Sequence, residues 1–281
     1  MSATIETSVA PHVSSAKAVK PTVLMCRPEH FTVSYRINPW MHPEDPTDTS
    51  LALRQWTVLY ETYLGLGFTV HLIDSLAGLP DMVYAANGGF VLDGIAYGAK
   101  FHYAERQPEG PAYMDWFRSQ GLDVREPVAT NEGEGDFLLV GDTILAASGF
   151  RSDTSSHQEI ARIFGREVVS LQLVNPSYYH LDTALAVIDS TTIAYLPSAF
   201  DEDSLETLRE RYPDAIIATE EDAAFLGLNS FSDGHNVVIA ERATTFARDL
   251  AERGYNPIGV DLSELLLGGG GVKCCTLELR T

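Results

Sequence analysis

The chain has 281 residues, and its 39 acidic and 19 basic side chains give it a formal net charge of −20. This charge argues against a nucleic-acid partner, which would require clusters of Lys and Arg. No apolar run approaches the roughly 18 residues of a membrane span. A negative field favours the arrival of a cationic small molecule, although acidity also keeps a protein in solution. The 45% hydrophobic content is that of an ordinary globular protein.

Residues 1–20 contain no apolar core segment, so they predict a solvated tail rather than a secretory signal. We expect residues 21–281 to form a single domain. Three cysteines, two of them adjacent, make a poor disulfide framework and indicate a reducing cytoplasm. The sequence is compatible with a homo-oligomer without defining one.

Apolar residues spaced three or four positions apart predict five amphipathic helices. Several of these segments end at or just before a glycine, as helices commonly do. A short apolar segment with strand character follows each helix. The predicted helices are 51–66, 111–120, 155–164, 203–212 and 244–253, and the predicted strands are 68–73, 124–127, 168–173, 215–219 and 257–260.

Three β-hairpins are predicted around acidic turns at Asp93, Asp142 and Asp189, which are 49 and 47 residues apart, and a fourth hairpin is expected to start at Asn236. The resulting unit of hairpin, helix and strand recurs about five times, with the chain ends contributing partial units. Such short units must share one core. We therefore predict an α/β fold, a five-bladed propeller of ββαβ units. The hairpins disfavour the alternative, a doubly wound parallel sheet.

A glycine run, Gly268 to Gly271, precedes two adjacent cysteines near the C-terminus. Glycine permits backbone conformations closed to other residues and lets a ligand approach the chain. If Cys274 begins a strand, successive side chains alternate, and one cysteine alone faces what the glycines expose. Cys274 is then either a nucleophile or, like Cys275, a small buried residue.

In a propeller, equivalent loops of every unit converge at one end of the axis, so the polar residues just before each hairpin should meet there. These residues, which Cys274 would join, include Asp81, Asn87, Glu132, Glu134, Asp136, His180, Asp182 and Asn229. On an extended chain, His180 and Asp182 would point the same way. Three alternating carboxylates in residues 132–136 would also share one side, which suits either a bound cation or a solvated surface loop.

A thiolate nucleophile needs a base, and the base needs an orienting carboxylate. Cys274, His180 and one of Glu132 or Glu134 supply that set. The remaining carboxylates suit a guanidinium, whose planar N–H donors pair with carboxylate and amide oxygens. A bound guanidinium would also lower the pKa of the thiol, which negative neighbours otherwise raise.

The motifs of residues 132–136, 180–183 and 269–274 together resemble those of the guanidine-modifying enzyme superfamily. That group has a five-bladed α/β propeller, the pentein fold, and includes dimethylargininases, arginine deiminases, arginine dihydrolases and glycine amidinotransferases. The resemblance runs from about Cys26 to the C-terminus. Among these enzymes, the sequence resembles bacterial dimethylarginine dimethylaminohydrolase-like and arginine dihydrolase-like members most.

The resemblance implies that Cys274 is the nucleophile, that His180 is a general acid and then a base, and that Asp182 binds the guanidinium. An extra Glu interrupts the family's spacing in the acidic motif. Glu134 is the preferred residue to orient His180 or hold the substrate, with Glu132 as its rival. No cofactor and no metal are implied.

Further substrate-binding candidates surround this set. Asn87 stands where arginine deiminases have Asp and dihydrolase-like members have Asn. Asp136, Asp81 and Asn38 are additional candidates to contact the substrate. Arg106 would suit the α-carboxylate of an amino acid, although an Arg in a charged loop is also often solvated.

The expected reaction is hydrolysis of the guanidinium C–N bond of Nω-methylated arginine or arginine through a covalent intermediate, giving citrulline with an amine or ammonia. One alternative is an arginine dihydrolase that proceeds to ornithine, and another is an amidinotransferase that passes the group to an amine. A metal hydrolase using His180, Asp182 and the acidic loop lacks the usual ligand spacing. The fourth alternative is a protein that binds arginine without catalysing a reaction.

Overall fold

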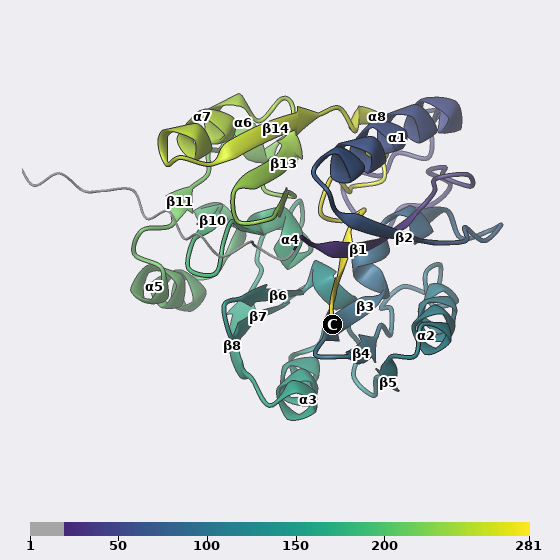
Figure 1. Cartoon of the computed structure of the whole chain (residues 1–281), viewed down its shortest axis with the longest axis horizontal. Coiled ribbons are helices and arrows are strands. Elements are labelled where there is room, and N and C mark those ends of the chain that lie inside the picture. The colour runs from purple at the N-terminus through teal and green to yellow at the C-terminus, as the bar shows by residue number, and fades with distance from the viewer. Residues whose placement is uncertain (1–19) are drawn as a thin grey trace, which may run out of the picture.

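Five units, each with two antiparallel strands, a helix and a third strand, build the part of the chain that this computed structural model describes, residues 20–281 (Figure 1). The predicted N-terminal tail therefore lies outside the described residues, except for Lys20. In every unit the second and third strands run parallel. The predicted repeat of hairpin, helix and strand is thus present.

The elements of the units are, in chain order, β1 (Thr22–Cys26), α1 (Thr49–Gly65), β2 (Thr69–Ile73); β3 (Gly89–Leu92), β4 (Ile95–Gly98), α2 (Glu109–Ser119), β5 (Asp123–Arg125); β6 (Phe137–Val140), β7 (Thr143–Ser148), α3 (Thr154–Phe164), β8 (Glu167–Gln172); β9 (Leu185–Val187), β10 (Ile193–Tyr195), α5 (Glu202–Arg211), β11 (Ile216–Ile217); β12 (Phe231–Ser232), β13 (Asn236–Ala240), α7 (Thr244–Glu252), β14 (Asn256–Val260); and β15 (Leu277–Arg280). Three short helices lie between them, α4 (Leu181–Ala184), α6 (Glu220–Ala223) and α8 (Ser263–Leu266).

The two ends of the described chain close one unit together. β15 pairs antiparallel with β1, and β1 pairs in parallel with β2, as the prediction of partial terminal units requires. β15 also pairs in parallel with β3, which joins two units into a six-stranded sheet of order β2-β1-β15-β3-β4-β5. The remaining units form three-stranded sheets. The fold is a mixed α/β fold, and the propeller arrangement stays a prediction.

Each of the five predicted helices begins and ends within two residues of the observed one. The Asp93–Gly94 turn also forms as expected, because both residues adopt the positive φ angles, 51° and 77°, of a tight hairpin turn. The α1 helix shows why the spacing of apolar residues predicted the helices correctly. Trp56, Leu59 and Tyr63 lie on one face of that helix and are fully buried, and burying each stabilises the fold by about 1.5–3 kcal/mol.

Two local predictions were wrong. The fourth hairpin does not start at Asn236, because β13 is its second strand and pairs with the two-residue β12 before it. Cys274 and Cys275 do not begin a strand either. They lie in a turn in which the Cys275 N–H donates to the carbonyl of Gly271 and the Thr276 N–H donates to that of Lys273, so β15 starts only at Leu277.

The segments that precede the hairpins do converge, as predicted. The Ala86 N–H before β3 donates to the carbonyl oxygen of Cys274 at 3.0 Å. The Leu181 N–H before β9 donates to Asp136, just before β6, at 3.2 Å. In Figure 1, α4 lies toward the middle of the molecule. Nowhere in residues 20–281 does a helix combine the length and hydropathy of a membrane span.

Candidate active site

Cys274 lies at the centre of the converging loops and is 2% exposed. Its Sγ donates to Asp182 Oδ2 at 3.2 Å and accepts a hydrogen bond from Asn229 Nδ2 at 3.1 Å. The neighbouring Cys275 is fully buried in an apolar cluster, and its side chain makes no hydrogen bond within residues 20–281. The two adjacent cysteines therefore differ in surroundings, and Cys274 alone faces polar groups.

Asn229 holds the turn that carries this thiol. Its Oδ1 accepts from the N–H groups of Cys274, at 3.0 Å, and Gly271, at 3.1 Å, while its Nδ2 also donates to the Asp182 carbonyl. The sequence placed Asn229 among the polar residues before a hairpin but gave it no role. A side chain with one acceptor and two donors can bridge a turn and a helix in this way.

The glycine run allows close packing around the thiol. A Cβ atom on Gly270 would collide with the Tyr84 ring and would lie 3.1 Å from the Cβ of Cys274. Gly269 adopts φ +86°, a conformation that favours glycine. These glycines therefore allow close packing of protein side chains, and the approach of a ligand to them stays a prediction.

His180 contacts Glu132, not the preferred residue Glu134. Its Nε2 lies 2.8 Å from Glu132 Oε2, and both side chains are buried. The Arg151 guanidinium donates to the same carboxylate at 2.8 Å. Burial alone would raise the pKa of the Glu132 carboxyl, but Arg151 and His180 hold it well below its usual range.

Glu134 points elsewhere, because residues 133–135 form one turn of 3-10 helix rather than an extended chain. With about three residues per turn, residues two apart no longer share a side. The Glu134 carboxylate accepts from Lys273 Nζ at 2.6 Å and also pairs with Arg280. Asp136 accepts from Ser152 Oγ at 2.5 Å and from the first N–H of α4, so its carboxylate stabilises the local fold, and its contact with substrate stays a prediction.

The expectation of a shared extended face was also wrong for His180 and Asp182, since Asp182 lies in the first turn of α4. Both nevertheless line the site. Burial raises the pKa of Asp182 to about 7, although Lys273 and the thiol oppose the shift. Burial, followed by the charge of Asp182, raises the pKa of the Cys274 thiol well above its usual value.

The remaining substrate-binding candidates, Arg106, Asn87 and Asp81, already form hydrogen bonds with other residues. Arg106 donates two hydrogen bonds to Glu109, at 3.0 and 2.8 Å, and one to the amide oxygen of Asn87 at 2.8 Å. The Asn87 oxygen is therefore already paired in this state. Asp81 Oδ2 accepts from Tyr35 at 2.9 Å.

Both polar atoms of the Asn38 side chain already make hydrogen bonds with other residues. Its oxygen accepts from the N–H groups of Trp40 and Met41, and its nitrogen donates to Tyr179 Oη and the Gly268 carbonyl. These bonds fix the loop of residues 31–41 against the glycine run, and the substrate contact of Asn38 stays a prediction.

Arg151 is a residue that the sequence did not single out, because it belongs to no motif and follows β7 in an irregular loop. Its guanidinium packs against the rings of Tyr103 and Tyr179, at 4.8 and 4.5 Å from their centroids. It also lines a hollow of about 310 Å³ together with Ile37 and Phe150. Besides its bonds to Glu132 and the Ile37 carbonyl, Arg151 keeps N–H donors to spare.

Three buried polar atoms of the site lack a hydrogen-bond partner within residues 20–281, namely His180 Nδ1, Asp182 Oδ1 and Asp81 Oδ1. Buried polar atoms are nearly always paired with protein, ligand or ordered water, so these three atoms are available to a bound polar group. Two of them are carboxylate oxygens, which accept from a donor-rich cation. A thiol, an imidazole–carboxylate pair and unpaired carboxylate oxygens are the components of nucleophilic chemistry on a cationic substrate.

Comparison with known proteins identifies the class. A sequence model of the eukaryotic N,N dimethylarginine dimethylhydrolase family matches residues 27–281. The chain belongs to this family, whose members are hydrolases of the C–N bonds in linear amidines.

Individual relatives agree with this assignment. The chain is 52% identical over 259 residues to the N(G),N(G)-dimethylarginine dimethylaminohydrolase of Mycobacterium tuberculosis, covering 91% of this chain and 85% of the relative. It is 36% identical to the bifunctional arginine dihydrolase/ornithine cyclodeaminase ArgZ of a Synechocystis species, over 92% of this chain but only 37% of that protein.

Solved structures of the N-terminal domain of ArgZ match with a TM-score of 0.89 and 34% identity, covering 93% of this chain and 98% of that domain. One of them is bound to substrate, and another is covalently bound to a reaction intermediate.

Proposed function

We propose that this protein is a cysteine-dependent hydrolase that cleaves Nω-methylated arginine to citrulline and an amine. The observation that carries the proposal is the meeting of Cys274 and Asp182 at 3.2 Å in a buried site that also holds the His180–Glu132 pair. The 52% identity to a dimethylarginine dimethylaminohydrolase supports the methylated substrate. Arginine itself is the second candidate substrate, favoured by Asn87 and by the likeness to ArgZ.

In the proposed first half-reaction, Asp182 holds the guanidinium through its unpaired oxygen. Cys274 gives its proton to Asp182 and attacks the guanidinium carbon, forming a C–S bond. Protonated His180, held by Glu132, gives its proton to the departing amine as the C–N bond breaks. The product of this step is a cationic amidino-thioether. The covalent intermediate of the ArgZ domain is the precedent.

In the second half-reaction, neutral His180 takes a proton from water while the hydroxide adds to the same carbon. The C–S bond then breaks, Asp182 returns its proton to the sulfur, and the urea group of citrulline remains. The proton on the urea oxygen passes to solvent and is taken up by the released amine, which becomes an ammonium ion. Charge and protons therefore balance, and every group returns to its starting state.

Arg151 is proposed to bind the α-carboxylate of the substrate, because its spare donors face the hollow beside the site. We expect Arg151→Met to raise KM for arginine-type substrates by roughly 10–100-fold, the effect of a lost charge-assisted hydrogen bond. Decarboxylated arginine should share only the smaller loss that comes from the unpaired Glu132, so the loss should be larger for arginine. Arg36→Met, at an exposed residue of the same hollow, is the matched control and should behave as the parent. Equal losses with both substrates would contradict this role.

The pH dependence follows from Asp182, whose pKa is about 7. The carboxyl is charged above that pH, so it binds a guanidinium there and loses this ability as pH falls. We expect kcat/KM to drop about tenfold per unit below pH 7, because this ratio reports the free enzyme. Asp182→Asn should remove that acid limb from the residual activity. An acid limb that survives the substitution would show that another group causes it.

The five units are proposed to surround one axis as a propeller that makes residues 21–281 a single domain, as the ArgZ-domain likeness supports. A cytoplasmic location is part of the same proposal. A single cooperative unfolding transition that coincides with loss of activity would support one domain, whereas two separated transitions would reject it.

The deciding experiment is product identification from dimethylarginine and from arginine side by side. Citrulline with dimethylamine supports the proposal, and citrulline or ornithine with ammonia from arginine supports the dihydrolase alternative. Amidino transfer to added glycine would show an amidinotransferase, and loss of activity in EDTA would show a metal hydrolase. No turnover of either substrate would leave a binding protein.

A further inference from the structure

A second cavity, of about 1170 Å³, has a lining that includes none of the residues of the proposed active site. It is lined by the turns of three hairpins, near Gly141, Ser190 and Gly234, and by residues of β9 and β15. Neither Cys274 nor His180 nor Glu132 lines it. Its volume is slightly above the roughly 300–1,000 Å³ of small-molecule sites.

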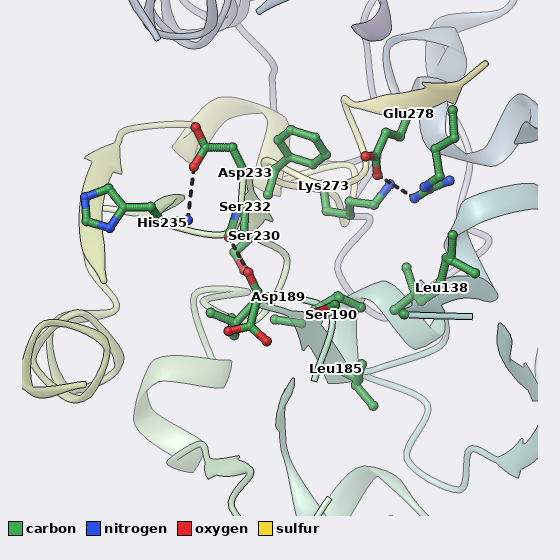
Figure 2. A pocket seen from close by; sticks show the side chains of 18 of the residues that line it. Leu138, Leu185, Asp189, Ser190, Ser230, Ser232, Asp233, His235, Lys273 and Glu278 are labelled. Atoms are coloured by element: carbon green, nitrogen blue, oxygen red, sulfur yellow. Dashed lines mark hydrogen bonds and ion pairs between the residues drawn. The ribbon is translucent and has the colours of Figure 1, made fainter. Parts of the chain in front are cut away.

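Lys273, Arg280 and Glu278 line one end of this cavity, and the buried Glu134, which pairs with both cations, brings the sum of these four charges to zero. Lys273 and Arg280 both pair with Glu134, and Arg280 also donates to Glu278 Oε2 at 2.5 Å. Figure 2 shows Lys273 and Glu278 together on one side, opposite Asp233 and His235. Asp233 is already paired with Lys20 at 2.8 Å.

Several polar groups that line the cavity still have an unused hydrogen-bond donor or acceptor. Lys273 Nζ donates to Glu134 and to the Thr276 carbonyl, which leaves one of its three N–H groups. Within the described residues 20–281, Glu278 Oε1 and the buried hydroxyl of Ser230 have no hydrogen-bond partner. A cation donor, a hydroxyl and a carboxylate oxygen are thus all unused in one cavity.

We propose that this cavity is a second binding site, for a small aliphatic α-amino acid. The carboxylate of the ligand would accept from Lys273, Arg280 and Ser230, and its ammonium group would donate to Glu278. Leu138, Leu185 and the other apolar lining residues would contact its side chain. A zwitterion fits because it adds no net charge to a balanced site, whereas a buried uncompensated charge is costly.

The site adjoins the thiol through the backbone. Lys273 and Ser230 are the chain neighbours of Cys274 and Asn229, and the Lys273 N–H donates to the Asn229 carbonyl at 3.2 Å. An occupant of the cavity therefore contacts the segment that positions the nucleophile. The inference itself does not depend on the proposed reaction, because binding is measured directly.

Isothermal titration calorimetry of the full chain tests the site with three probes: L-leucine, 4-methylpentanoate, which lacks the ammonium group, and 3-methylbutylamine, which lacks the carboxylate. We expect leucine to bind, the carboxylate probe to bind more weakly and the amine not to bind. No heat with leucine, or equal binding of the amine, would overturn the proposal.

Variants locate the binding. Val187→Trp fills the cavity from β9 and should weaken leucine binding at least about tenfold, whereas Val128→Trp, at an exposed residue outside the cavity, should not. Glu278→Gln should weaken leucine but leave 4-methylpentanoate unchanged. Arg151→Met, beside the catalytic candidates, should retain leucine binding. If Arg151→Met lost leucine binding while Val187→Trp retained it, leucine would bind in the active site, and the second site would be rejected.

Discussion

Cys274→Ser is expected to lower kcat by about 10⁴-fold or more, because the covalent route disappears with the thiol and a hydroxyl is a far weaker nucleophile. The substitution nearly conserves volume, and a hydroxyl accepts the Asn229 bond and donates to Asp182 as the thiol does. Thermal unfolding should therefore change little. Steady-state turnover of dimethylarginine and of arginine, on protein shown to be folded, provides the measurement.

Cys275→Ser is the matched control one residue away. Cys275 is fully buried among apolar side chains, so a hydroxyl there costs about 1–3 kcal/mol of stability. We expect a lower melting temperature with kcat retained by the folded molecules. Iodoacetamide labelling should modify Cys274 in the parent, with guanidinium substrate protecting it. A Cys274→Ser enzyme that keeps a substantial share of its kcat would disprove the nucleophile assignment.

Much of the architecture was predictable because it depends on short-range patterns. The spacing of Trp56, Leu59 and Tyr63 identifies a helix without reference to its neighbours, and the Asp93–Gly94 pair defines its own turn. The repeat of these patterns then predicted which loops meet. The fourth hairpin was misplaced because β12 has only two residues, Phe231–Ser232, too few to show an alternating pattern.

The partners within the site were harder to predict, because they depend on the course of a few backbone bonds. Whether Glu132 or Glu134 reaches His180 is decided by one turn of 3-10 helix, which Gly133 permits with φ +55°. Arg151 and Asn229 act through tertiary contacts to distant segments, and no local motif marks them. Asp81 lies in the site, but only the structure shows its unpaired oxygen.

The second large effect is expected from Glu132→Gln, which should lower kcat by roughly 10²–10⁴-fold, the usual contribution of a positioned general acid–base group. An amide cannot carry the charge that faces both His180 and Arg151, and its NH₂ group cannot accept their hydrogen bonds. His180 then loses the partner that orients it. Activity should fall with dimethylarginine and with arginine alike.

Glu134→Gln is the informative comparison, since the two carboxylates are two residues apart and equally buried. The Glu134 carboxylate faces Lys273 and Arg280, so its loss leaves two cations without their buried partner and costs about 3–5 kcal/mol of stability. We expect a clear drop in melting temperature, with kcat per folded molecule within about tenfold of the parent.

Comparison of the two variants shows which carboxylate orients the His180 imidazole and which one only stabilises the fold. Glu132→Gln also strands Arg151, so both variants should unfold more easily, and stability alone does not distinguish them. The kcat measured below the unfolding transition does. If Glu134→Gln were the inactive variant and Glu132→Gln the active one, the 2.8 Å contact between His180 and Glu132 would not be the catalytic pairing. The mechanism would then require Glu134 to leave Lys273 and turn toward the imidazole, at the cost of a buried ion pair.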